Sequence, residues 1–133
     1  MQANRYQDLI AWQKAIAFVK RVYAITANFP QEETFGPKSQ MRRCVVSVPS
    51  NIAEGQGRGT PGEFQQFLGH ARGSLYELET QIVIASELGY FSVDERRTSL
   101  AEAGQLGRIL NALKASLKPV ARVSTAAQLT TDN

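Results

Sequence analysis

The sequence predicts an all-α protein: an antiparallel up-and-down four-helix bundle over residues 1–118, followed by a disordered tail over residues 119–133. Apolar residues recur at steps of three and four in four separate stretches, which is the spacing of a helix face. Capping residues, glycines or prolines bound these stretches, and no stretch alternates as a strand would. A chain of 133 residues with 43% apolar residues is one domain with room for a core.

The first predicted helix begins at Asp8 and runs to about residue 29, where Pro30 follows. It carries two neighbouring apolar stripes, one at positions 9, 12, 16, 19, 23 and 26 and one at positions 15, 18, 22, 25 and 29. This apolar surface is wider than one bundle seam needs. Either the helix is central and well buried, or one stripe faces another subunit. The candidate subunit interface consists of Phe18, Val22 and Ile25.

The second predicted helix starts near Pro37 and ends at residue 55 or 56, with Pro49 in its interior. A proline there removes one hydrogen bond, which suggests a kink or a specific packing role. One side of this helix carries a polar row, made of Ser47, Asn51 and Glu54. Buried polar groups need partners, so we expect the row to fix assembly through hydrogen bonds. Contact with a ligand or RNA is the alternative, and catalysis is a third.

The last two predicted helices each open with a capping box, in which a hydroxyl side chain precedes a glutamate by three positions. Thr60 and Glu63 start the third helix, which is expected to run to about residue 88. Ser92 and Glu95 start the fourth, which is expected to end before Pro119. The third helix also contains Gly69 and Gly73. Since glycine disfavours a helix, we expect a close helix contact there.

The formal charge of +3 is unevenly distributed along the chain. Residues 1–59 contain eight lysines and arginines and four acids, whereas residues 60–118 contain six and seven. The second helix holds a basic patch, and the glycine-rich turn after it holds one more arginine that an anion could contact. We take these cations as the candidate RNA- or anion-binding residues, with an ordinary solvated helix face as the alternative. They are Lys38, Arg42, Arg43 and Arg58.

Most enzyme chemistry has no support in the sequence. A di-iron bundle needs Glu-x-x-His pairs, and the single histidine, His70, follows Phe67 at that spacing. Cys44 lies in an apolar stripe and is interpreted as a core residue. The glycine-rich turn at 55–59 lacks the Lys-Ser or Lys-Thr of a P-loop. We therefore expect no catalytic residues, no metal and no cofactor.

The compartment is predicted from two features of the chain. One cysteine cannot form an internal disulfide, which fits a reducing environment. The first nine residues lead into no long apolar segment, so neither a signal peptide nor a membrane span is expected. Together these features predict a cytoplasmic protein without a membrane partner.

Three segments resemble a known family. They are YQDLIAWQKA at 6–15, an Arg-Arg pair at 42–43 followed by SVPSNIAEG at 47–55, and GSLYELETQ at 73–81. In combination they resemble the small four-helix-bundle proteins that are encoded within intervening sequences of 23S ribosomal RNA genes and are often described as ribosomal-protein-like. The resemblance covers roughly residues 6–118.

The resemblance implies a bundle that assembles into a ring-shaped homo-oligomer, commonly a homopentamer, and it implies no activity. A ring would repeat each basic patch around its axis. We therefore expect a non-enzymatic module of unknown precise role that binds RNA through a ring of basic patches. A protein-interaction scaffold without nucleic-acid binding is the alternative. An enzyme of unknown type that uses Asn51 or Glu54 is the remaining hypothesis.

Overall fold

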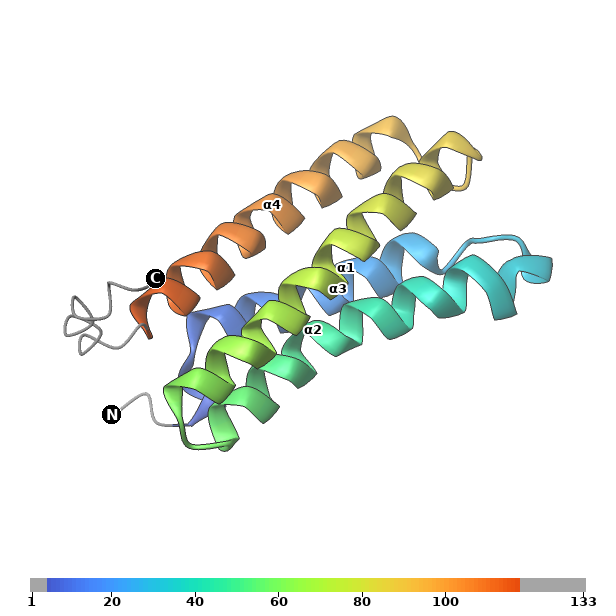
Figure 1. The fold of residues 1–133 in the computed structure, drawn as a ribbon. Coiled ribbons are helices and arrows are strands. Elements are labelled where there is room, and N and C mark those ends of the chain that lie inside the picture. Colours follow the sequence, from blue (N-terminus) through green and yellow to red (C-terminus); the bar gives the residue numbers. More distant parts are fainter. Residues whose placement is uncertain (1–4, 118–133) are drawn as a thin grey trace, which may run out of the picture.

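A computed structural model describes residues 5–117 and shows an all-α four-helix bundle with no strand among them (Figure 1). The main helices are α1 (Ile10–Thr26), α2 (Ser39–Gly57), α3 (Pro61–Glu87) and α4 (Val93–Ser116). Short turns η1 (Tyr6–Asp8), η2 (Gln31–Glu33) and η3 (Thr34–Lys38) precede α1 and α2. The tail expected over residues 119–133 lies outside the described residues.

Each helix packs on its neighbours in sequence, and α1 also packs on α4, which closes the bundle. The α1–α2 and α3–α4 connections lie at the same end of the bundle, and the tight α2–α3 turn lies at the other (Figure 1). Phe29 joins the two connections through ring contacts with Tyr90 and Phe91, at centroid distances of 5.0 and 6.1 Å. The Tyr90 hydroxyl also donates to Glu33, at 3.1 Å.

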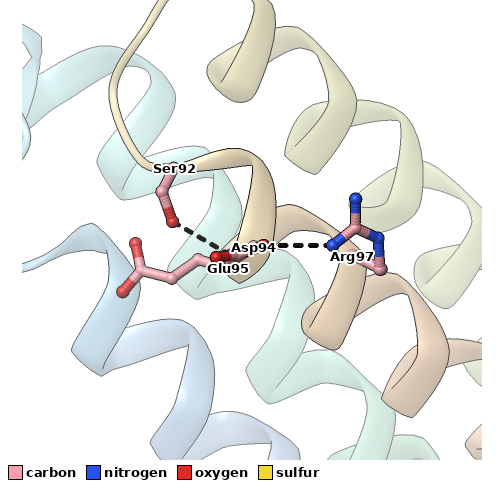
Figure 2. Close-up of polar contacts among 4 residues, drawn as sticks. All are labelled: Ser92, Asp94, Glu95 and Arg97. Atoms are coloured by element: carbon pink, nitrogen blue, oxygen red, sulfur yellow. Dashed lines mark hydrogen bonds and ion pairs between the residues drawn. The ribbon is translucent and has the colours of Figure 1, made fainter.

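Both predicted helix starts with a hydroxyl cap are confirmed. The Thr60 hydroxyl oxygen accepts from the Glu63 amide at 3.2 Å, and Pro61 occupies the first position of α3. At the start of α4, the Ser92 hydroxyl oxygen accepts from the Glu95 amide at 3.0 Å (Figure 2). These caps satisfy amides that have no partner within the helix, and so they fix where each helix begins.

The predicted cap of the first helix is wrong by one residue. Asp8 lies in η1, and Leu9 takes the cap position of α1 in an extended conformation without a side-chain cap. Two contacts join η1 to the start of α1. The Tyr6 ring packs edge-on against Trp12, with 5.4 Å between the ring centroids, and the Gln13 side chain donates to the backbone carbonyl of Gln7 at 2.9 Å. Contacts between η1 and α1 therefore take the place of an aspartate cap.

The predicted subunit interface on the first helix is also wrong. Phe18 and Val22 are fully buried inside the single chain, within the core that all four helices form, and Ile25 is 7% exposed. The stripe of α1 that holds these residues is therefore the buried one. The other stripe is only partly buried along most of its length, and Thr26 at its end is fully buried. A charge at Phe18 would unfold the chain rather than separate subunits.

The close helix contact is at Gly55 instead of the predicted Gly69 and Gly73. A methyl group at Gly55 would lie 2.6 Å from Cβ of Phe67, so α2 and α3 approach closely there. At Gly73 a methyl group would meet nothing within 4 Å. Pro49 is buried inside α2, which is continuous across it.

Candidate nucleic-acid interface

A shallow groove of about 410 Å³ opens where α2 begins, beside the middle and end of α1. Helix α2 starts just after Gly36, whose backbone angles (φ −115°, ψ −111°) interrupt the helical path. The groove therefore lies at the positive end of the α2 dipole. Its lining is mainly cationic and hydroxylic, and consists of Tyr23, Thr34, Lys38, Ser39, Arg42, Arg43 and Val46. We call it the cationic groove.

Arg42 is fixed in place by contacts with α1. Its Nε donates to Oγ1 of Thr26 at 2.9 Å, and its Nη2 donates to the backbone carbonyl of Tyr23 at 3.1 Å. The guanidinium carbon lies 4.3 Å from the centroid of the Tyr23 ring, which is a cation–π contact. Thr26 is fully buried and also donates to the carbonyl of Val22 at 2.8 Å. Arg42 thus links the N-terminal end of α2 to α1.

Lys38 and Arg43 complete the groove and have no acidic partner. Among residues 5–117, the ion pairs involve Arg21, Arg58, Arg96 and Arg97, and none involves a cation of the cationic groove. Glu33, the acid closest in sequence to Thr34, accepts from Tyr90 at the end of the bundle. No acid among residues 5–117 therefore forms an ion pair with these cations, although Arg43 also lines, together with Glu77, a small hollow between α2 and α3.

The structure separates Arg58 from the other three predicted binding residues. Arg58 follows the last residue of α2, roughly 22 Å along the helix axis from Arg43 at 1.5 Å per residue. It pairs with Glu54 at 2.9 Å, and its guanidinium lies 4.9 Å from the centroid of the Phe67 ring. Because its charge is paired and its position is distant, Arg58 does not belong to the cationic groove.

The predicted polar row bonds mostly to its own helix. The Ser47 hydroxyl donates to the carbonyl of Cys44 at 2.7 Å, and the Asn51 amide donates to the carbonyl of Ser47 at 2.8 Å. Glu54 is exposed and pairs with Arg58, one of the partners expected for it. Ser47 also lines a small hollow of about 190 Å³ between α2 and α3.

Cys44 lies at the base of this hollow and is buried. Its thiol donates to the carbonyl of Ser74 at 3.1 Å. Burial, together with the charge of the nearby Glu77 and a hydrogen bond to it, raises the pKa of Cys44 to about 11. A thiol with this pKa stays protonated near neutral pH and is a poor nucleophile. The hollow therefore offers no reactive thiolate.

Tyr23, Thr34 and Ser39 line the cationic groove but were not predicted as site residues. The spacing of Tyr23 placed it in the partly covered apolar stripe of α1, where an aromatic residue is usually a packing residue. Its distance of 19 positions from Arg42 gives no local pattern that links the two. Only the packing of α1 against α2 brings the ring and the guanidinium together.

Two further findings limit what the described residues can do. Within residues 5–117, no three side chains of the types His, Cys, Asp or Glu gather in a way that could hold a metal ion. None of the helices in that range combines the length and hydropathy that crossing a bilayer would require.

The fold and this groove define a small helical-bundle protein with a cationic groove that contains an aromatic side chain. The chain belongs to the family of 23S rRNA-intervening sequence proteins, whose sequence model matches residues 7–112. No curated protein matches the chain. A crystal structure of a protein of unknown function from the S23 ribosomal protein family of Bacteroides thetaiotaomicron is similar in fold, with a TM-score of 0.71 and 18% identity. The match covers 79% of this chain and 98% of that one.

Proposed function

We propose that this protein is a non-enzymatic RNA-binding module that works as a homo-oligomer, with the cationic groove as the RNA contact. One observation carries the proposal: Lys38 and Arg43 stand beside the anchored Arg42 without an acidic partner among the described residues. Phosphate contacts supply most of the affinity of a nucleic-acid-binding protein, and unpaired cations in a groove provide them. Membership of the 23S rRNA-intervening sequence family favours RNA over other polyanions.

Salt-dependent binding tests this proposal. Fluorescence anisotropy would follow a labelled, structured fragment of 23S ribosomal RNA against purified, nuclease-treated protein, from low to physiological salt. We expect the affinity to fall steeply with salt. In the double variant Lys38→Gln/Arg43→Gln, the slope against salt should decrease by about two, roughly one for each lost phosphate contact.

The matched control removes two charges that are already paired. Arg96 pairs with Glu87 at 2.8 Å and Arg97 with Asp94 at 3.0 Å (Figure 2 shows the latter pair). The variant Arg96→Gln/Arg97→Gln has the same net charge as the groove variant, and it should retain most of the affinity. An equal loss in both variants would mean that only net charge matters. No binding at low salt would contradict the proposal and favour the protein-interaction scaffold.

A different surface supports self-association. Phe35 is 95% exposed, although burying a phenylalanine normally stabilises a protein by about 1.5–3 kcal/mol. The next residue in the chain, Gly36, lines an apolar cavity of about 330 Å³ between the start of α2 and the end of α3, with Met41, Ile84 and Leu88 in its wall. An exposed ring next to an apolar cavity suits contact between two copies, in which the ring of one fills the cavity of the other.

Light scattering tests the assembly. For the homopentamer that the family resemblance implies, we expect a mass about five times the 14.6 kDa of one chain. Phe35→Ser should lower that mass, whereas Ile10→Ser, which changes another exposed apolar residue on α1, should not. A mass of one chain for the unmodified protein would contradict self-association.

A further inference from the structure

We propose that the cationic groove binds an unpaired nucleotide, so that the RNA it prefers is single-stranded, looped or bulged rather than a continuous duplex. This inference rests on the proposed RNA-binding function and adds the structural class of the RNA. It comes from the one aromatic side chain in the groove, Tyr23, and from how Arg42 holds it.

The Tyr23 ring is positioned before any ligand arrives. It is 41% exposed, so part of its surface is open to solvent. Arg42 covers one face of the ring at 4.3 Å and is itself held by Thr26 and by the Tyr23 carbonyl, so a base stacks on the part of the ring that Arg42 leaves exposed. A ring that is fixed in advance loses little freedom when a base stacks on it. Arg42 therefore acts as a positioning residue, and the ring provides the stacking surface.

The other side chains of the groove match the remaining parts of a nucleotide. Lys38, the N-cap residue of α2, and Arg43 within α2 lie five positions apart, about 7.5 Å along the helix axis, and supply two positive charges for the phosphate backbone. The hydroxyls of Thr34 and Ser39 line the same groove. Hydroxyl groups can donate to or accept from base edges and the ribose 2′-hydroxyl. The lining thus combines an aromatic surface, cations and hydrogen-bonding groups.

The size and shape of the groove also favour an unpaired nucleotide. Its volume of about 410 Å³ falls in the range of pockets that hold small ligands. Duplex RNA is recognised mostly through contacts spread over successive minor grooves, and its bases stay stacked inside the helix. A single concave site with one aromatic ring can stack a base only if that base has left the duplex.

Paired anisotropy titrations test the inference. One probe is a short labelled single-stranded RNA, and the other is the same strand closed into a perfect duplex. We expect the full-length protein to prefer the single strand. Tyr23→Leu should weaken single-strand binding by about tenfold and leave duplex binding unchanged, because one stacking contact is lost. Its salt slope should stay the same, since no charge is removed.

Two variants separate stacking from folding. Tyr23→Phe keeps the aromatic ring and should retain single-strand affinity. Tyr76→Leu is the matched control, because Tyr76 is 54% exposed on α3 and lies under Arg72 at 5.9 Å, away from the cationic groove. It should leave affinity unchanged. If Tyr23→Phe loses as much affinity as Tyr23→Leu, or Tyr76→Leu loses as much, stacking on Tyr23 is not the cause and the inference fails.

The outcomes distinguish this inference from the function on which it rests. Equal affinity for both probes, with no effect of Tyr23→Leu, would overturn the unpaired-nucleotide site and leave RNA binding in place. Binding to neither probe at low salt would overturn both. A preference for the single strand that disappears in Tyr23→Leu and persists in Tyr23→Phe would support both.

Discussion

The two ends of α2 differ in packing and in whether their charged side chains form ion pairs. At the C-terminal end, Gly55 allows α3 to approach closely, and Arg58 is paired with Glu54. At the N-terminal end, the helical path of the backbone is interrupted at Gly36. Lys38 and Arg43 form no ion pair with an acid among the described residues. The first end is closed by packing and ion pairing, and the second is open and positively charged.

Under the proposed function, this difference assigns ligand binding to the N-terminal end of α2. A charge that is paired within the chain attracts a charged ligand only weakly. An unpaired charge on a helix that is held in place attracts it more strongly. At the open end, Arg42 holds α2 in place through its hydrogen bonds to α1. Changes at the closed end should therefore affect stability. At the open end, loss of the unpaired cations should affect binding, and loss of the Arg42 anchor should affect stability.

The largest effect is expected at Gly55. Gly55→Ala should lower the free energy of unfolding by about 1–3 kcal/mol, because the new methyl group would overlap Cβ of Phe67, which cannot move freely. Urea denaturation measures the change. Gly73→Ala is the control: its methyl group meets nothing within 4 Å, and alanine favours a helix, so it should raise the free energy by up to about 1 kcal/mol. A stabilising Gly55→Ala would show that the closed end is not tightly packed.

The next effect concerns the anchor of the open end. Thr26→Val keeps the shape of a buried side chain but removes the oxygen that accepts from Arg42. We expect a loss of about 1 kcal/mol in the free energy of unfolding. Ser50→Ala is the control, since the exposed Ser50 hydroxyl donates only to the carbonyl of Val46 within α2, and its loss should cost less than about 0.5 kcal/mol. Equal effects in the two variants would mean that Arg42 is not held through Thr26.

A smaller effect is expected at Cys44, between the two ends. Because the pKa of Cys44 is raised to about 11, labelling by a disulfide reagent should be slow at pH 8 and should accelerate as the pH rises toward that value. Glu77→Gln removes one cause of the shift, so it should lower the pKa and speed labelling at pH 8 severalfold, while burial continues to slow it. Glu79→Gln should leave the rate unchanged. Rapid labelling of the unmodified protein would contradict the buried position of the thiol.

The smallest effect is expected for the ion pair at the closed end. Glu54 and Arg58 are each about half exposed, so solvent screens their attraction. Glu54→Gln should change the free energy of unfolding by less than about 0.5 kcal/mol and leave the oligomeric mass unchanged. A drop in mass would restore the assembly role that the sequence suggested for the polar row.

Local patterns in the sequence predicted the helices well. The caps at Thr60 and Ser92 are visible in the sequence because a hydroxyl side chain and the amide it bonds are three positions apart. The apolar stripes likewise reveal which positions face a core, since helix geometry fixes which residues share a face. The start of α1 was missed because contacts with η1, rather than a cap residue, determine it.

The candidate site was predicted only in part. Lys38, Arg42 and Arg43 were predicted together because they are close in sequence, and the structure brings them to one groove. Arg58 was grouped with them although the length of α2 separates it from them. Tyr23 was missed because it comes from another helix. Phe18, Val22 and Ile25 were assigned to an interface because two stripes of one helix are equivalent in a sequence pattern, and only the packing partners distinguish them.

The sequence by itself determined four helices, two of their caps and one basic end of α2. These features depend on residues within a few positions of one another, so chain geometry alone fixes them. The family is also visible in the sequence, through three segments spread along the chain. Only the tertiary structure decided which stripe of α1 is buried, that Gly55 is the point of close approach, and that Tyr23 and Arg42 are in contact. Each of these depends on the relative placement of two helices, which results from the packing of many side chains at once.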